Sequence, residues 1–304
     1  MRQRSLLLLF AVFIVSASFS YFAASDCLRS RAVCFGTNNP TPDSQLAPFR
    51  YRVLEPFLVK LFTPAPTQES VVVTVIVLYS VITALSLPML FIWLRRFVNE
   101  DRALVGVMVY ALVNCAAFHM WFISLGTPLE VLFVLLTLLL IDGGWLWIAP
   151  VVALASLNRE SSLLLVGIYA AWNWSTPSKR AGIVGLCGIW GLITLGLHVI
   201  LGAAPHTLGL VGTALYNWEN IIDGLATNAV LLPLYILIVQ GYRHAPPKLK
   251  RLALVGGVYV GALVVGSTYG EIMRLILPIL PLFIPLALNS KVSDTLQPNS
   301  KFLQ

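Results

Sequence analysis

Charged residues are scarce in this sequence. Aspartate, glutamate, lysine and arginine make up 11% of the 304 residues, whereas a soluble domain usually carries about 25%. Hydrophobic residues reach 58% and the mean hydropathy is +0.84. Apolar runs of about 20 residues, the length that crosses a bilayer, recur along the chain. The shortage of charge therefore excludes an ordinary soluble domain and predicts an all-α, polytopic membrane helix bundle.

Several functional signatures are absent. The sequence has no phosphate-binding Walker loop, no dinucleotide fingerprint, no HExxH motif and no nucleophile elbow. It lacks the alternating apolar and polar strands of a membrane barrel. The net charge of +7 does not indicate nucleic acid, because the basic residues fall in short clusters between apolar runs. No metal-ligand spacing is present, so no cofactor is predicted, and a requirement for a divalent metal stays open.

Cysteine is also rare, with four residues. Cys115 and Cys187 lie inside apolar runs, where cysteine behaves as a small hydrophobic residue. Cys27 and Cys34 share the first polar loop, and they would form a disulfide if that loop faces an oxidising compartment. Their spacing does not match a zinc site.

The apolar runs predict about ten membrane legs in one transmembrane domain, residues 1–290. Its first outer loop, 25–69, includes an interfacial segment, and 291–304 form a short cytoplasmic tail. The first run follows a basic N-terminus and is taken as a retained span, with a cleaved signal peptide as the alternative. The predicted legs are 5–24, 70–94, 103–124, 128–141, 145–157, 161–174, 182–202, 225–241, 252–269 and 275–288.

The segment 145–174 holds Arg159 and Glu160 in its middle. As one straight helix it would be about 45 Å long, against a hydrocarbon core of about 30 Å. Two legs of about 20 Å each fit better, and they form a broken short-helix hairpin. Charged or irregular backbone at depth requires cover by protein or water. We therefore expect the corner at 158–160 to lie below the membrane surface in a water-filled recess.

Charge distribution supports this arrangement. With the N-terminus inside and every leg crossing, most of the 20 lysines and arginines fall on the inner side, as the positive-inside rule requires. A single span at 145–174 would instead turn the most basic cluster, RHAPPKLKR, outward. Both termini are therefore predicted to be cytoplasmic.

The remaining charges gather at the outer ends of the legs, and together they predict one polar cavity that borders the lipid. Arginine forks bind phosphate oxygens, and a carboxylate there can act as a general base. Simpler explanations are a mutual ion pair for Glu271 and Arg274, a helix-dipole role for Glu130, and head-group anchoring for the basic residues before the second leg. The candidate residues are Arg50, Arg52, Glu55, Glu130, Arg159, Glu160, Glu271 and Arg274.

Three stretches carry a resemblance to a known family: PFRYRVLEPFL, ASLNRESSLLL and YGEIMRLILPILPLFIPLAL. In layout and in these motifs the chain resembles the GT-C superfamily of integral membrane glycosyltransferases, and more specifically its small bacterial members. The resemblance implies a bacterial plasma-membrane enzyme. It would transfer a sugar, with inversion, from a polyprenyl-phosphate donor to an extracytoplasmic glycan or protein acceptor.

The resemblance also implies roles for residues. An acid of the first outer loop would be the catalytic base, and the candidates are Asp26, Asp43 and Glu55. Arg159 and Arg274 would hold the lipid phosphate, assisted by Arg50 or Arg52. Glu160 and Glu271 would orient the arginines or contact sugar hydroxyls.

Two alternatives remain open from the sequence. A transporter or lipid flippase also uses broken helices and buried charges, although no inverted repeat is visible. A non-catalytic GT-C-like subunit of a cell-envelope assembly would keep the fold without the reaction.

Overall fold

The computed structural model of the chain describes residues 52–63, 67–118, 125–202, 229–266 and 275–289, together with Phe10, Ala11, Ile14 and Glu219. Several predictions fall outside these residues: most of the first span, the C-terminal tail, the Cys27–Cys34 disulfide, and the candidates Asp26, Asp43, Arg50, Glu271 and Arg274.

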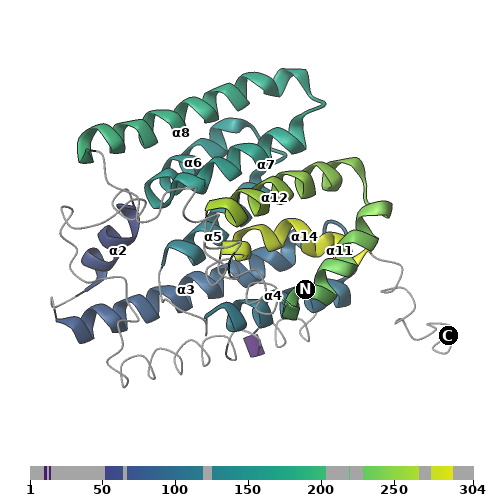
Figure 1. Cartoon of the computed structure of the whole chain (residues 1–304), viewed down its shortest axis with the longest axis horizontal. Coiled ribbons are helices and arrows are strands. Elements are labelled where there is room, and N and C mark those ends of the chain that lie inside the picture. Colours follow the sequence, from purple (N-terminus) through teal and green to yellow (C-terminus); the bar gives the residue numbers. More distant parts are fainter. Residues whose placement is uncertain are drawn as a thin grey trace.

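The described part of the chain is a helical bundle without strands (Figure 1), so the predicted all-α fold is confirmed. Most predicted legs between 70 and 288 match a helix to within a few residues. An exception is 252–269, where the helix already begins at Pro247. The preceding helix ends at His244, and Ala245 is extended before Pro246. The elements are α2 Leu54–Phe62, α3 Gln68–Leu94, α4 Glu100–Phe118, α5 Gly126–Leu140, α6 Trp145–Asn158, η3 Glu160–Ser162, α7 Leu163–Asn173, η4 Pro177–Lys179, α8 Arg180–Leu201, η5 Ala229–Leu231, α11 Leu232–His244, α12 Pro247–Gly266, η6 Leu277–Ile279 and α14 Leu280–Leu288.

Glycines allow the closest helix contacts. A Cβ atom on Gly241 would collide with the backbone carbonyl of Leu286, so the missing side chain lets α11 lie directly on α14. On α8, a Cβ at Gly182 would stand 2.6 Å from the Cβ of Trp145, so α6 and α8 meet at this glycine. Small residues at such points bring helix backbones together, as is common in membrane bundles.

Two described helices are long and apolar enough to cross a membrane, Val73–Leu94 and Pro177–Leu201. They differ in cover: 44% of the apolar window of the first is buried, but only 6% of the second. Soluble proteins seldom expose an apolar surface of this extent, so the exposed helix is consistent with membrane association. Its most exposed large side chains are Val184, Leu192, Leu195, Val199 and Ile200.

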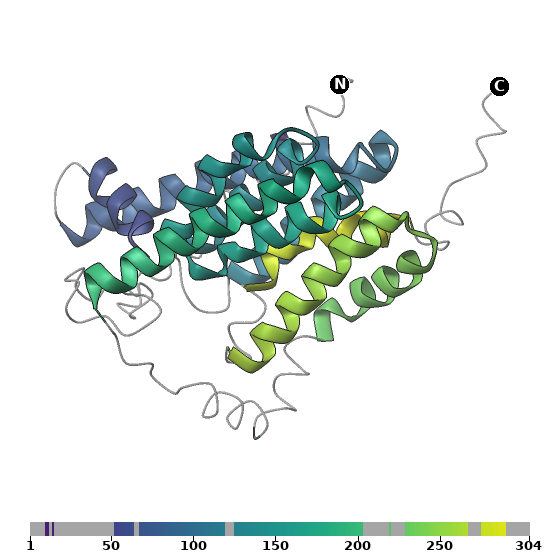
Figure 2. The ribbon, with the colours of Figure 1, turned by 90° about the horizontal axis from the view of Figure 1, so that it is seen from above.

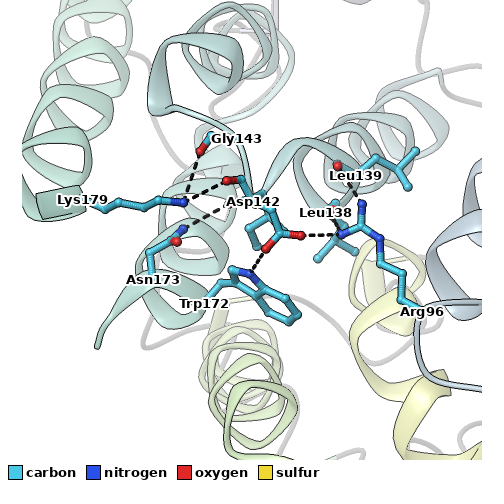
Figure 3. A network of polar contacts seen from close by, with 9 residues as sticks. Arg96, Leu138, Leu139, Asp142, Gly143, Trp172, Asn173 and Lys179 are labelled. Atoms are coloured by element: carbon cyan, nitrogen blue, oxygen red, sulfur yellow. Dashed lines mark hydrogen bonds and ion pairs between the residues drawn. The ribbon is translucent and has the colours of Figure 1, made fainter. Parts of the chain in front are cut away.

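Four turns lie together at one end of the bundle, here called the basic end: 95–99, 141–144, 174–179 and 245–246. Asp142 connects three of them (Figure 3). Its carboxylate accepts hydrogen bonds from Arg96 at 3.0 Å and from the indole of Trp172 at 2.8 Å, and its carbonyl accepts one from Lys179 at 3.0 Å. Lys248 follows the fourth turn, and its Nζ lies 4.5 Å from the Trp172 ring centroid, so this turn lies beside the other three. Of the basic clusters that were predicted to share one side, those at 95–102, 179–180 and 243–251 are described, and they lie together.

The helix α2 lies at the other end of the bundle. Figures 1 and 2 both show it crosswise to α3, beside the residues with which α3 begins. Its side chains Phe57, Leu61 and Phe62 are exposed, whereas Leu54 and Leu58 pack against the core. A crosswise helix with exposed apolar side chains fits the predicted interfacial segment.

Candidate functional site

The chain reverses direction between α6 and α7, as predicted from the length of this segment. At the start of α6 and the end of α7, the side-chain amide of Asn173 donates to the carbonyl of Ile141 at 3.3 Å. At the opposite ends, the amide of Asn158 donates to the carbonyl of Gly126 at 2.8 Å. Both contacts are made to the two ends of α5, so α6 and α7 run in opposite directions beside it. The predicted broken hairpin is confirmed.

The hairpin corner, Asn158–Ser162, consists of polar residues whose side chains make hydrogen bonds outside the helix backbone. Arg159 is extended, with φ −158° and ψ 148°, and a short 3-10 turn follows before α7 begins. The hydroxyl of Ser156 donates to the carbonyl of Val152 at 2.7 Å, and Ser162 lies 3.3 Å from that hydroxyl. Serine and asparagine side chains that bond to nearby groups favour helix ends and bends, and α6 ends at Asn158, where Arg159 becomes extended.

Arg159 and Glu130 form the centre of the corner. Nη1 of Arg159 donates to Oε2 of Glu130 at 3.1 Å, and Nη2 donates to the hydroxyl of Thr127 at 2.9 Å. The other carboxylate oxygen of Glu130 accepts from Ser161 at 2.6 Å and from the hydroxyl of Tyr259 at 3.2 Å. Glu130 therefore joins three parts of the bundle: α5, the hairpin corner and α12.

The start of α5 contacts both Glu55 and the hairpin corner. The N–H of Leu125 donates to the carboxylate of Glu55 at 2.8 Å, so α2 is attached at the start of this helix. The corner then attaches to Gly126, Thr127 and Glu130 in turn. The acid that accepts a hydrogen bond at the N-terminus of α5 is thus Glu55 of α2. Glu130 is the fifth residue of the helix, and the helix-dipole alternative for it is not supported, since its carboxylate is used by the ion pair.

The corner lies deep along the bundle. The indole of Trp190, midway along α8, donates to the backbone carbonyl of Glu160 at 3.1 Å. Tyr259 is the thirteenth residue of α12, which puts it about 18 Å along that helix from the basic end. The corner therefore lies at the ends of α6 and α7 that are farther from the basic end, and beside the middle of the exposed helix α8.

Burial at the corner differs from the expected water-filled recess. Arg159 and Glu130 are each 3% exposed, so neither side chain lines an open hollow. A charged side chain at depth is tolerated when a partner covers it, and here the ion pair itself supplies that cover. The prediction of a wet recess is wrong for this guanidinium, because opposite charge and hydrogen bonds replace water.

Arg159 and Glu160 have separate surroundings, as expected for adjacent residues. The Glu160 side chain is half-buried, and it takes no part in the hydrogen bonds of Arg159 and Glu130. Arg52 precedes α2 and is half-buried at the same end as Glu55. Of the candidates, the structure therefore pairs Glu130 directly with Arg159, and it places Glu55 at the neighbouring start of α5 through the N–H of Leu125.

Sequence reasoning missed Thr127, Ser161 and Tyr259. Ser161 follows the candidate Glu160 and Thr127 lies three positions before Glu130, and both are ordinary helix-end residues. Tyr259 is a single hydroxyl in a run of glycine, valine and alanine, and only that isolation singles it out. In the described part of the chain, no group of three or more His, Cys, Asp and Glu residues could hold a metal ion.

Comparisons with known proteins add no further guide. No family model, curated protein or solved structure matches the chain. The site must be interpreted from its own geometry.

Proposed function

We propose that the chain is a multi-pass protein of a bacterial plasma membrane that transfers a sugar from a polyprenyl-phosphate donor to an extracytoplasmic glycan or protein acceptor. In this proposal the basic end faces the cytoplasm, in accordance with the positive-inside rule. Both termini are cytoplasmic, and α2 lies in the outer membrane–water interface. The exposed apolar length of α8 supports the membrane placement.

The observation that carries the site is the incomplete pairing of a buried arginine. A guanidinium has five N–H donors. Nη1 and Nη2 of Arg159 make the bonds to Glu130 and Thr127, but the buried Nε has no partner among the described residues. A buried donor without a partner costs about 1–3 kcal/mol. A phosphate oxygen that accepts from this side of the fork would remove that cost, while Glu130 holds the fork in place. Because Arg159 is buried in this structure, the proposal requires the corner to open when the lipid phosphate enters.

The reaction requires a base, and Glu55 is already used in the structure. Its carboxylate accepts the N–H of Leu125, so we assign Glu55 to positioning α2 rather than to proton transfer. Asp26 or Asp43 of the outer loop would then take the proton from an acceptor hydroxyl. That hydroxyl attacks the anomeric carbon of the sugar, the bond from this carbon to the phosphate oxygen breaks, and the configuration inverts.

The leaving polyprenyl phosphate gains negative charge as this bond breaks. Arginines stabilise developing charge best when they are held in place before the reaction. Arg159 is held so by Glu130 and Thr127. In the proposal Arg274 and Arg50 or Arg52 complete the phosphate site, and Glu160 and Glu271 contact sugar hydroxyls or orient the arginines.

The direct test is transfer of a radiolabelled sugar from polyprenyl phosphate to an acceptor by the purified chain. Arg159→Lys keeps the charge but loses the fork, and we expect at least a tenfold loss of transfer. Arg96→Lys at the basic end changes an arginine that also forms a 3.0 Å ion pair, and should keep full activity. Full transfer by a folded Arg159→Ala variant would remove the assigned role of the corner.

One observation favours a second candidate, a transporter or lipid flippase. The corner lies beside the middle of α8, and transporters place their binding sites near the bilayer midplane at broken helices. Accessibility separates the two functions. In a transporter, a cysteine at Ser161 would react with a membrane-impermeant reagent from the cytoplasmic side in some state, whereas in the proposed transferase it would not.

If the chain is a non-catalytic assembly subunit, deletion of its gene would leave the pool of lipid-linked sugar unchanged.

A further inference from the structure

A second charged region lies at the basic end, far from the hairpin corner. Two arginines there are paired with acids: Arg95 with Glu100 and Arg96 with Asp142, both at 3.0 Å. Other cations at this end have no carboxylate partner among the described residues. They are Lys179 and Arg180 at the start of α8, and Arg243, Lys248, Lys250 and Arg251 around the turn from α11 to α12.

Trp172 and Asp142 connect the two groups of cations. This residue, near the end of α7, lies under Lys248, whose Nζ is 4.5 Å from the ring centroid. At the edge of the ring, its indole N–H donates to Asp142, the residue whose carbonyl binds Lys179 (Figure 3). Figures 1 and 2 both show the turn between α7 and α8 near the turn between α11 and α12.

Asp142 cannot neutralise these cations. One of its carboxylate oxygens accepts from Trp172 and the other from Arg96. Among the described residues, Lys179 donates only to carbonyl oxygens, those of Asp142 at 3.0 Å and Gly143 at 3.4 Å. The ammonium of Lys248 meets the face of an indole rather than an acid. The region therefore keeps a net positive charge close to a fixed aromatic surface.

Apolar surface begins one turn beyond the cations on both helices. On α8, Val184 follows Arg180 and is 72% exposed. On α12, Leu254 follows Arg251 and is 65% exposed. Cations that border exposed apolar helix faces stand at the level where a bilayer has its head groups, if those faces contact lipid.

From this juxtaposition we propose that the region over Trp172, between the starts of α8 and α12, binds the head group of an anionic phospholipid of the cytoplasmic leaflet. Arg180 and Lys248 contact the phosphate from its two sides. The occupant is a lipid because charge and apolar surface adjoin: the phosphate meets the cations, and the acyl chains lie on the exposed faces of α8 and α12. The inference depends on membrane placement and not on sugar transfer.

The test is a titration of the full chain in neutral detergent with phosphatidylglycerol or phosphatidylcholine, followed by native mass spectrometry. We expect tighter binding of the first phosphatidylglycerol. Each juxtamembrane cation contributes about fivefold to binding of an anionic lipid, so Arg180→Gln with Lys248→Gln should weaken it about 25-fold. The binding of phosphatidylcholine should change little, and Lys248→Arg should keep the preference.

A matched variant separates a specific site from general charge. Arg95→Gln with Arg102→Gln removes the same two charges at the same end of the bundle, and should weaken phosphatidylglycerol binding by less than threefold. Equal losses in the two double variants, or no preference in the unmodified chain, would overturn the proposal. Release of the lipid by millimolar inorganic phosphate would instead identify a site for free phosphate. Sugar transfer measured on the same variants should be unchanged, so failure of one proposal does not decide the other.

Discussion

Arg159 and Glu130 form an ion pair of 3.1 Å in which the two side chains are 3% and 4% exposed. They are 29 residues apart, and their contact holds the hairpin corner against α5. The comparable pair Arg95–Glu100 has the similar length of 3.0 Å, but its side chains are 44% and 22% exposed. Pairs of similar geometry in such different surroundings should differ greatly in their effect on stability.

Removal of one partner of the buried pair should destabilise the fold strongly. Glu130→Gln leaves the guanidinium of Arg159 buried without its counter-charge, and we expect a loss of about 3–5 kcal/mol in the free energy of unfolding. Glu130→Leu combined with Arg159→Met should lose less than Glu130→Gln alone, because no charge is left behind. Unfolding of the purified chain in mixed detergent and denaturant measures both. Glu100→Gln is the control, with an expected loss of about 0–1 kcal/mol.

The hydroxyl of Tyr259 is expected to attach α12 to the corner. Tyr259→Phe removes one donor from the carboxylate of Glu130, and about 1 kcal/mol of stability should be lost. Tyr242→Phe on α11 serves for comparison, because Tyr242 is 42% exposed and its hydroxyl loss should be near neutral. If both phenylalanine variants unfold like the original chain, the 3.2 Å contact to Glu130 contributes nothing to stability.

Glycines along α8 allow a matched pair of substitutions on one helix. Gly182→Ala would bring a methyl group within 2.6 Å of Trp145, so the side chain or the helix must shift, with an expected loss of about 1–3 kcal/mol. Gly188→Ala meets open space, and alanine favours the helix over glycine by about 1 kcal/mol. The two variants should therefore move the unfolding midpoint in opposite directions. A shift of the same sign in both would contradict the close packing of α6 on α8.

Most of the fold could be predicted from the sequence because lipid-length apolar runs and their polar breaks determine the helix bounds. The hairpin at 145–174 followed from two further constraints, the excess length of a single helix and the distribution of basic residues. The length of a helix and the number of basic residues on each side follow from the sequence alone, so both can be evaluated without a three-dimensional structure. The hydrogen bond from the Asn158 amide to the carbonyl of Gly126 holds the turn that these two constraints predict.

The partners within the site could not be predicted in the same way. A sequence shows that Arg159 needs cover, but it does not show whether water, a ligand or an acid supplies it. The choice of Glu130 depends on how α5 packs beside the hairpin, which brings together residues 29 positions apart. The contribution of Tyr259 depends on the same packing, since α12 reaches the corner only in the assembled bundle. The recess was predicted because these partners were unknown.

The hairpin makes a prediction about topology that does not depend on any activity. In a variant with its four cysteines replaced by serine, single cysteines would be placed at Gly144, Ser175 and Lys60, all of which are exposed. Because α6 and α7 return the chain to its starting side, Gly144→Cys and Ser175→Cys should react with a membrane-impermeant maleimide from the same face of sealed vesicles. Lys60→Cys, on α2, should react from the opposite face. If residues 145–174 crossed the membrane once, Gly144→Cys and Ser175→Cys would label from opposite faces, and the buried pair of Arg159 and Glu130 would lose the bend that brings them together.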